Sequence, residues 1–508
     1  MRHTIFLISI VTCLTASAQE STYRYQDAIG LWRTTDNAAG LTLDSIVDRG
    51  FAAFTLQRKE GSYNRVQEGD QQNMLQFESE RYQRVGRYLV GYGHFVFDMD
   101  RTKNRSWADV YRPYESNPYF PGSSVPGKYD QQSFDFTGAM GTVNFNGWRF
   151  GLRTDYKVGD LSRLRDPRSR AQLLDYKITP SVTYTTGRHT IGLAPYYNRR
   201  KEKMPTLTTV QNDPNLSYYE MRGLEQCIGA VGAYKSFSRE WVDHRLGVSL
   251  NYGYHNDYLN SVTTLGYCHG SEDIYENEKH EPGHYTTNTY SLATRNRISS
   301  GSLLHEIDLE ANYQEAYGDE YTQQRIQTTD AETGVNSYHY ETLIAYEKRY
   351  QMRRLQGSLH YRLNFVEAQQ TMGYAGLTFD MQNTRQKHVL PLSTFNYQRF
   401  GLTLEGGKQL LKDQLWLDIS GGYHFTGTKD SDLSLAEPTT DYAQQVLLPD
   451  MQYYTANYWR GHVQVTYELP ITIKGIQTRW FARAYADYLR TNNSLDGKTF
   501  GLTIGIFN

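Results

Sequence analysis

The sequence is poor in the features that mark several common protein classes. Only three of its 508 residues are cysteine, so a disulfide framework does not hold the fold together. No apolar run reaches the ~20 residues of a transmembrane helix. The mean hydropathy is −0.67, which also excludes a helical membrane protein with several spans. The 53 basic and 55 acidic residues nearly cancel, so the charge gives no reason to expect nucleic-acid binding.

Aromatic residues, by contrast, are abundant. The chain has 43 tyrosines, and aromatic residues make up 14% of a sequence that is polar on average. Disordered chains contain few aromatic residues, so this composition indicates a folded protein. A chain of this length has room for three soluble domains of ~150 residues, but a single all-β barrel also reaches this size.

Residues 1–18 have the pattern of a secretory signal peptide. Two basic residues precede an apolar stretch over residues 4–15, and Ala16-Ser17-Ala18 is a small-residue cleavage site. Cys13 raises the alternative of a lipoprotein signal, but it follows Thr12 where such signals carry glycine or alanine. The sequence therefore predicts an exported protein.

Long segments of the remaining chain alternate between apolar and polar residues, as membrane-spanning β-strands do. One face of the segment 354–365 carries Leu355, Gly357, Leu359, Tyr361, Leu363 and Phe365, and the other carries Arg354, Gln356, Ser358, His360, Arg362 and Asn364. In the segment 476–488, Trp480 and Tyr488 stand at the two ends of the apolar face. Aromatic girdles occupy these positions at the two interfaces of a membrane.

The connections between these segments alternate in length along the whole chain. We predict short turns near Gln83–Gly86, Asn146, Gly187, Ser238–Val242, Ser299–Ser302, Glu367–Gln369, Leu411–Asp413 and Pro470–Gly475. We predict longer connections at 59–71, 99–131, 159–173, 200–225, 256–284, 317–352, 383–397, 426–455 and 490–496. Eight short and nine long connections require eighteen strands, the first over Phe51–Gln57.

This pattern predicts an all-β fold, a transmembrane antiparallel barrel with short periplasmic turns and long outer loops. Sixteen strands are the alternative if one hairpin is misread. A soluble sandwich also alternates, but its strands average about 5–6 residues, against roughly 11–14 here. The expected organisation is a short periplasmic or lumenal segment over residues 19–50, followed by the barrel over residues 51–508.

The last strand carries a second signal. Thr499, Gly501, Ile504 and Ile506 follow the order of the C-terminal signal that the barrel-assembly machinery reads, although Phe507 is penultimate rather than last. We therefore expect the barrel-assembly machinery and outer-membrane lipids as partners, and the bacterial outer membrane as the location.

Several segments resemble an uncharacterised family of outer-membrane β-barrels from anaerobic gut-type and oral-type bacteria. They are Asp36–Leu41, Ser79–Gly86, Arg112–Tyr119 and Asp166–Arg168. The resemblance extends from about Tyr25 to the C-terminus, and it implies the fold and the location but no catalytic residues. Asn37-Ala38-Ala39-Gly40 also resembles the Asn-Pro-Ala-Gly start of hydrophobic-compound transporters, with Ala38 in place of proline.

Two local patterns invite a chemical interpretation. His280-Glu281-Pro282-Gly283-His284 matches the H-E-x-x-H string, which binds zinc when a helix brings both histidines to one face. Pro282 and Gly283 are unfavourable inside a helix, so a solvated charged loop is the favoured interpretation. Cys227 and Cys268 remain after signal cleavage, either as a disulfide pair or as two separate thiols. We predict no metal, no cofactor and no catalytic residue.

Charged residues of both signs alternate with the apolar faces and are expected to point into the lumen. These candidates are Arg149, Arg153, Glu306, Asp308, Glu310, Arg354, Arg362, Asp418, Arg479, Arg483 and Asp487. They line a permeation or binding path in one interpretation, and they form a network of pairs that stiffens a wide barrel in the other. The long connection 99–131 contains four prolines among aromatic residues and could fold inward as a constriction.

The predicted function is a porin-like, non-enzymatic channel or transport component for an unknown solute. A TonB-dependent receptor needs a large plug domain, whereas about 32 residues separate the predicted signal peptide from the first strand. One alternative is a closed scaffold barrel that displays loops to a surface lipoprotein, a transport partner or a ligand. A hydrolase at the barrel rim is a further alternative, although no nucleophile-elbow motif is present.

Overall fold

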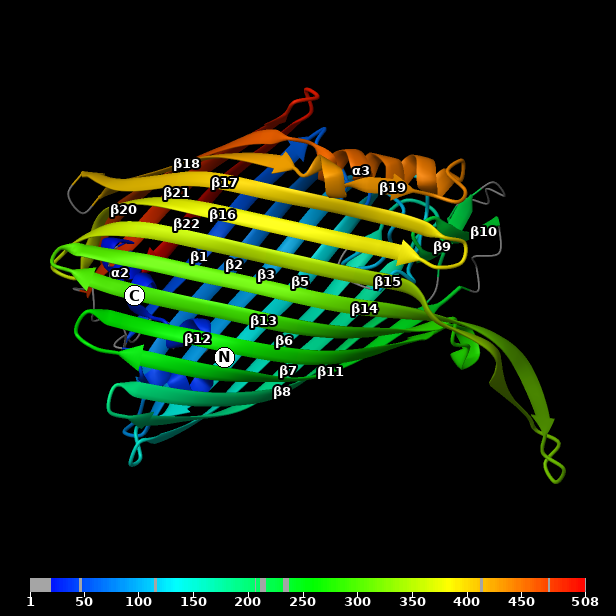
Figure 1. Ribbon diagram of the computed structural model, residues 1–508, viewed down its shortest axis with the longest axis horizontal. Helices are drawn as coiled ribbons and strands as arrows, with labels where there is room; N and C mark the ends of the chain where they lie inside the picture. Colours follow the sequence, from blue (N-terminus) through cyan, green and yellow to red (C-terminus); the bar gives the residue numbers. More distant parts are fainter. Residues whose placement is uncertain are drawn as a thin grey trace.

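Antiparallel pairing joins eighteen strands into one closed barrel in the computed structural model (Figure 1). The structure describes residues 20–44, 48–113, 117–205, 207–210, 216–231, 237–411, 414–473 and 476–507. The predicted signal peptide lies outside these residues. No described helix is long and apolar enough to cross a membrane.

Each barrel strand pairs with its neighbours along the chain. The strands are β1 (Arg49–Gly61), β2 (Gln71–Val85), β3 (Leu89–Arg105), β5 (Gly127–Thr142), β6 (Trp148–Arg163), β7 (Arg170–Thr186), β8 (His189–Met204), β11 (Arg239–His255), β12 (Leu259–Tyr275), β13 (Gly283–Ser300), β14 (Leu303–Thr329), β15 (Asn336–Glu367), β16 (Gln370–His388), β17 (Ser393–Leu411), β18 (Leu415–Thr426), β20 (Tyr458–Ile473), β21 (Ile476–Thr491) and β22 (Asp496–Phe507). The predicted count of eighteen is therefore confirmed, and sixteen is excluded.

The barrel closes between its first and last strands. β1 pairs with β22 from Phe51 opposite Phe507 to Gly61 opposite Gly497. Both the start of β1 and the end of β22 lie where the connections are short, such as residues 187–188 and 301–302. We call this the turn end of the barrel and the opposite end the loop end.

Alternation along the strands separates an apolar outer surface from a polar lumen. On β15, Leu355, Leu359 and Phe365 are 39%, 46% and 48% exposed on the outside, while Arg362 points inward. Exposed aromatic residues lie toward both ends, with Trp148 on the turn side and Trp459 on the loop side. The predicted faces of this strand are confirmed, since residues two apart share one side of a strand.

One predicted hairpin is misplaced although the count is right. The predicted turn at Ser238–Val242 lies inside β11, and most of the predicted loop 256–284 is strand β12. The segment 226–237, which the predicted turns would leave as a barrel strand, instead begins with β10 (Gln226–Val231) of a separate sheet. The two errors cancel in the count.

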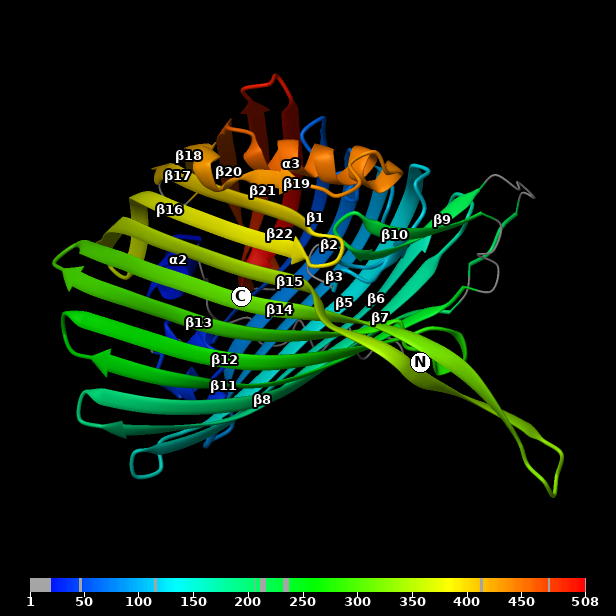
Figure 2. The same ribbon diagram turned by 45° about the vertical axis from the view of Figure 1, so that its right-hand side comes forward.

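The loop end carries the irregular elements (Figure 2). They include β4 (Pro121–Gly122), β9 (Ser217–Gly223) and β10, which form a three-stranded sheet, together with β19 (Asp432–Ser434), which pairs with β17, η4 (Asn277–Lys279), η5 (Thr428–Asp430), the π-helical turn η6 (Ala443–Leu447) and helix α3 (Leu448–Thr455). The hairpin of β14 and β15 extends well beyond the barrel rim (Figure 1).

Candidate functional site

Residues 20–44, here called the plug segment, lie inside the barrel at its turn end (Figures 1 and 2). They form helix α2 (Glu20–Ile29) and the two 3-10 turns η1 (Trp32–Thr34) and η2 (Ala38–Thr42). Most of their side chains are buried against lumen-facing residues of the strands. A short segment therefore occupies the turn end of the lumen.

Two ion pairs hold α2 to one side of the barrel. Arg24 binds both carboxylate oxygens of Asp418 on β18, with its Nη1 and Nη2 each at 2.8 Å. The Arg24 guanidinium also lies 4.6 Å from the ring centre of Trp416. Glu20 pairs with Arg483 on β21, with Oε2 at 3.2 Å from Nη2. These contacts place one acid and one base of α2 on opposite charges of the barrel wall.

A second charged cluster holds α2 to the start of the barrel. Arg49 on β1 binds Asp27 of α2 and Glu80 of β2, each at 2.8 Å. Tyr23 donates its hydroxyl to Glu80 Oε1 at 2.8 Å, and its ring lies 4.0 Å below the Arg49 guanidinium. Arg49 and Glu80 are buried whereas Asp27 is about half exposed, so removal of Arg49 or Glu80 would leave the other buried charge without its partner.

The C-terminal half of the plug segment contacts the opposite wall. Asp36 pairs with Lys177 Nζ on β7 at 2.6 Å. Asn37 donates from Nδ2 to Asn251 Oδ1 on β11 at 2.9 Å, and the backbone N–H of Ala39 donates to Ser181 Oγ at 3.1 Å. The plug segment thus spans the lumen and bonds to both sides of it.

Four lumen-facing glycines make room for this half of the plug segment. A Cβ on Gly141 or Gly151 would overlap the backbone of Ala38, and on Gly151 also that of Ala39. A Cβ on Gly192 would lie 2.6 Å from the Asn37 amide, and one on Gly253 would lie 2.6 Å from the Trp32 ring. The strands are therefore shaped to receive the segment.

A cavity of about 740 Å³ adjoins α2 inside the barrel. Its lining includes Glu20 and Arg24 of α2 and Arg362, Glu306 and Arg483 of the wall. The ion pairs that hold α2 therefore border a polar space large enough for several water molecules.

The loop end is filled by a hydrophobic core, here called the loop-end core. Three segments fold inward to build it, at residues 106–126, 216–231 and 432–457. Trp107 and Tyr119 are 0% and 1% exposed, and Trp241 Nε1 donates to the Tyr119 carbonyl at 3.0 Å. Asn117 donates to Glu272 Oε2 on β12 at 3.0 Å. Of the predicted connection 99–131, the two ends belong to β3 and β5, and the described residues 106–113 and 117–126 between them contribute to this core.

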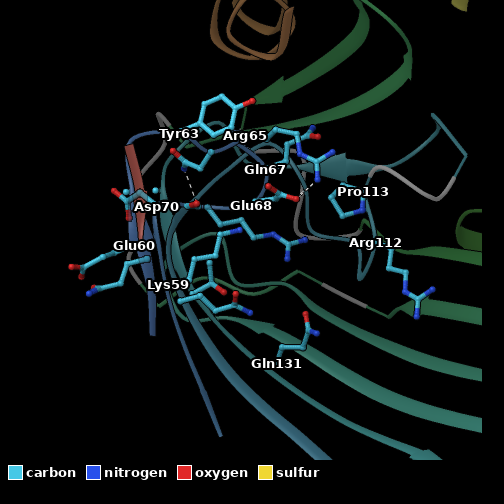
Figure 3. A pocket seen from close by; sticks show the side chains of 18 of the residues that line it. Lys59, Glu60, Tyr63, Arg65, Gln67, Glu68, Asp70, Arg112, Pro113 and Gln131 are labelled. Carbon is cyan, nitrogen blue, oxygen red and sulfur yellow. Dashed lines mark hydrogen bonds and ion pairs between the residues drawn. The ribbon is translucent and has the colours of Figure 1, made fainter. Parts of the chain in front are cut away.

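A polar cavity of about 290 Å³ opens beside this core and is here called the vestibule (Figure 3). Lys59 on β1 and Arg112 on the inward loop belong to its lining. Arg65 pairs with Glu68 within it, and Arg65 Nη1 donates to Tyr454 Oη of α3 at 2.8 Å. Pro113 lies beside Arg65 in the same view. The vestibule is a hydrated approach to the core from the loop end.

Six of the predicted lumen charges meet the plug segment or a residue that binds it. One is Arg479, which lies 3.8 Å from Glu468, the acceptor of a hydrogen bond from the Glu20 backbone N–H at 3.1 Å. Asp418 and Arg483 bind α2 as described above, and Arg153 lies 4.0 Å from Asp36 while pairing with its own neighbour Asp155 at 2.9 Å. Glu306 and Asp308 bind Arg297 at 3.2 and 2.5 Å. Arg297 in turn donates from Nε to the Ala28 carbonyl at 2.6 Å.

The other predicted charges are distributed along the wall and do not form one site. Arg149 donates to Thr185 Oγ1 at 2.9 Å, and Glu310 pairs with Arg295 at 2.9 Å. Arg362 pairs with Glu405 at 2.7 Å, and Asp487 pairs with Arg460 and His462 at 3.1 Å each. Arg354 contacts only the Met352 sulfur, at 3.7 Å, within the described chain. Most of these charges are paired within the barrel.

The predicted assembly residues lie on the closing strand. Thr499 and Gly501 face the lumen side of β22, and Ile504 is 51% exposed on the outer side, the side that Ile506 shares. That the barrel-assembly machinery recognises these residues stays a prediction.

The H-E-x-x-H string and the cysteines form no joint site. His280 pairs with Glu276 at 2.8 Å in the short connection before β13, and His284 of β13 pairs with Asp273 of β12 at 2.9 Å. Within the described residues no group of histidine, cysteine and carboxylate side chains is arranged to hold a metal. Cys227 and Cys268 are separate thiols.

Sequence reasoning missed the residues that hold the plug segment. Glu20, Arg24 and Asp27 precede the first strand and follow no strand periodicity. Their signal was the spacing of Glu20, Tyr23, Arg24 and Asp27, which puts them on one face of a helix. The wall partners Arg49 and Glu80 were likewise missed.

The chain was compared with known proteins. The search of curated proteins finds no matching sequence. Among solved structures, the copper transporter OprC is 10% identical with a TM-score of 0.39, over 91% of this chain and 81% of that one. The ferric-catecholate import receptor Fiu from E. coli K12 is 9% identical with a TM-score of 0.40, over 91% of this chain and 82% of that one. The FrpB iron transporter from Neisseria meningitidis is 8% identical with a TM-score of 0.41, over 93% of this chain and 83% of that one. A family model matches residues 38–508, and the chain therefore belongs to the family of unknown function DUF6850.

Proposed function

We propose that this protein is an outer-membrane transport barrel that is closed at both ends at rest and opens when the plug segment is released. The observation that carries the proposal is the way the plug segment is held. Its bonds to the wall include ion pairs that border a polar cavity, such as Arg24 with Asp418 and Glu20 with Arg483. Because these pairs are largely buried, loss of one partner leaves a charge uncompensated and favours release of the segment.

The wide barrel and its apolar outer surface support placement in the bacterial outer membrane. Such barrels turn their short connections to the periplasm and their long loops outward. The plug segment would then face the periplasm, where a transport partner or lipoprotein could reach it, and the vestibule would face the outside. The transported solute is left open.

Single-channel recording in a planar bilayer tests the proposal. We expect the full chain to show brief openings separated by long closures. The double variant Glu20→Gln/Arg24→Gln removes the two charges of α2 that bind Arg483 and Asp418, so its open fraction should rise at least tenfold. The matched control is Arg58→Gln/Glu60→Gln, which neutralises an exposed ion pair of the same types on β1.

The control variant should behave like the wild-type chain. Silence of both the wild-type chain and the α2 variant, with correct folding shown by heat-modifiable migration on a gel, would contradict transport. A steadily open wild-type chain would contradict closure at rest.

A closed scaffold is the second candidate. The loop-end core and the hairpin of β14 and β15, which reaches beyond the rim, support it (Figure 1). A barrel that stays silent while it co-purifies with a partner through this hairpin would favour the scaffold.

A further inference from the structure

A second internal cavity lies between the loop-end core and the lumen, and we call it the aromatic cavity. Its volume is about 110 Å³. Phe120, Leu447 and Asp450 of the inward segments line one side, and Tyr350 and Arg354 of β15 line the other. It is therefore enclosed by both the loops and the barrel wall.

The aromatic cavity adjoins the vestibule. Gln67 and Pro113 line both spaces, so they form the partition between them. Gln67 Nε2 donates to the Trp107 carbonyl at 3.2 Å and lies 3.4 Å from the Tyr442 hydroxyl. The two spaces are therefore neighbours at the loop end.

Arg354 brings an unpaired positive charge to the aromatic cavity. Its Nε atom is buried without a hydrogen-bond partner, and its Nη2 contacts only the Met352 sulfur among the described residues. No carboxylate of the described chain forms an ion pair with it, although most other lumen arginines have one. A guanidinium in this position is suited to two parallel bonds with a carboxylate.

Asp450 of α3 contributes a second unsatisfied polar group. It is 6% exposed, and its Oδ1 atom is buried with no partner in the described chain. Burial raises the pKa of Asp450 to about 7, while Arg65 lowers it and Glu68 raises it to a smaller extent. Near neutral pH the group is therefore protonated in much of the population and can donate a hydrogen bond.

The rest of the lining suits an apolar body. Tyr397 stacks on Tyr454, with ring centres 4.1 Å apart and planes at 11°, and Phe395 contacts Tyr397 edge-on at 5.9 Å. An internal cavity of roughly 150 Å³ binds benzene, so this smaller cavity admits only a small organic body. The cavity therefore combines aromatic side chains with several polar groups, and such polar groups fix the orientation of a ligand in a small-molecule site.

We propose that the aromatic cavity binds a small organic carboxylate, with its carboxylate on Arg354 and its apolar or aromatic body against Phe395 and Tyr397. Asp450 in its protonated form donates a hydrogen bond to the same anion. Binding at this site requires the cavity but no opening of the plug segment. Only the biological role of the bound carboxylate rests on the proposed function.

Isothermal titration calorimetry of the full chain in detergent tests this site, with benzoate and phenylacetate as probes. We expect saturable binding of at least one of them, and at least tenfold weaker binding of the matching amide, which lacks the charge. Arg354→Gln should weaken binding at least tenfold, and Arg354→Lys, which keeps charge without the planar fork, should weaken it less. The matched control is Arg353→Gln, the next residue on the outer face, which should bind as the wild-type chain does.

Two results would overturn the site. One is the absence of saturable heat with both probes in a wild-type chain that migrates as a folded barrel. The other is unchanged affinity in Arg354→Gln. Since titration measures binding without flux, a chain that binds but never conducts would refute transport and keep the site, and a chain that conducts but does not bind would do the reverse.

Discussion

At the scale of single residues, the fit of the plug segment depends on glycines in the barrel wall, which leave room for its backbone. Gly151 on β6 touches the backbone of Ala38 and Ala39, so Gly151→Ala should displace η2 without disturbing the barrel strands. Overpacking of this kind costs about 1–3 kcal/mol. We expect a higher open fraction in bilayer recordings, by roughly fivefold or more.

The matched control for Gly151→Ala is Gly93→Ala. Gly93 lies on β3 with no atom within 4 Å of an added Cβ. Equal effects of the two substitutions would show that the plug segment is not seated on Gly151.

Asp450 makes stability depend on pH. Its pKa is about 7 in the folded chain and near 3.8 without burial, so the folded state binds the extra proton. Folding therefore loses stability as the pH rises from about 4 to about 7, by at most about 4 kcal/mol. Asp450→Asn mimics the protonated form and should flatten this loss.

The measurement for Asp450 is the thermal unfolding midpoint at pH 5 and pH 8. The unfolding midpoint of the wild-type chain should fall further between pH 5 and pH 8 than that of Asp450→Asn. Asp441→Asn, on an exposed acid just before η6, should follow the wild-type chain. If the unfolding midpoint of Asp450→Asn falls as steeply as that of the wild-type chain, the pH dependence belongs to other groups.

At the scale of elements, α2 depends on the sign of its charges. Exchanging the partners in Arg24→Asp/Asp418→Arg keeps one charge of each sign at the contact. Each single substitution places like charges together and should favour release of α2 by about 2 kcal/mol, a roughly thirtyfold rise in open fraction. The double variant should recover part of the closed state.

Recovery in the double variant is the informative outcome, since barrel damage would not be repaired by a second substitution. Additive effects of Arg24→Asp and Asp418→Arg would show that the two residues do not act as a pair.

Elements also show why the sequence predicted the barrel better than its details. β12 has Ser261, Thr263 and His269 on its outer face, so its alternation between apolar and polar residues is weak. The segment of β10 is apolar or small after Gln226 and pairs with β9 outside the barrel sheet, so local periodicity could not place it. Period-2 alternation reports a two-faced strand and says nothing of which sheet it joins.

The candidate site was predictable only in part for the same reason. Asp418 and Arg483 were recognised as lumen charges because each follows a strand period. Their partners Glu20 and Arg24 lie over 390 residues away in the chain, on a helix whose position only the folded barrel defines.

At the scale of the whole molecule, the two ends of the barrel should face different compartments. The hairpin tip at Thr333 is exposed at the loop end, and Arg188 is exposed in a turn at the turn end. In intact cells, Thr333→Cys should react with a membrane-impermeant maleimide and Arg188→Cys should not, until the outer membrane is permeabilised. The wild-type chain gives the background from Cys227 and Cys268, which are both partly buried. Labelling at Arg188→Cys alone would invert the orientation, and it would place the ion-paired plug segment at the outer surface and the loop-end core, with its aromatic cavity, on the periplasmic side.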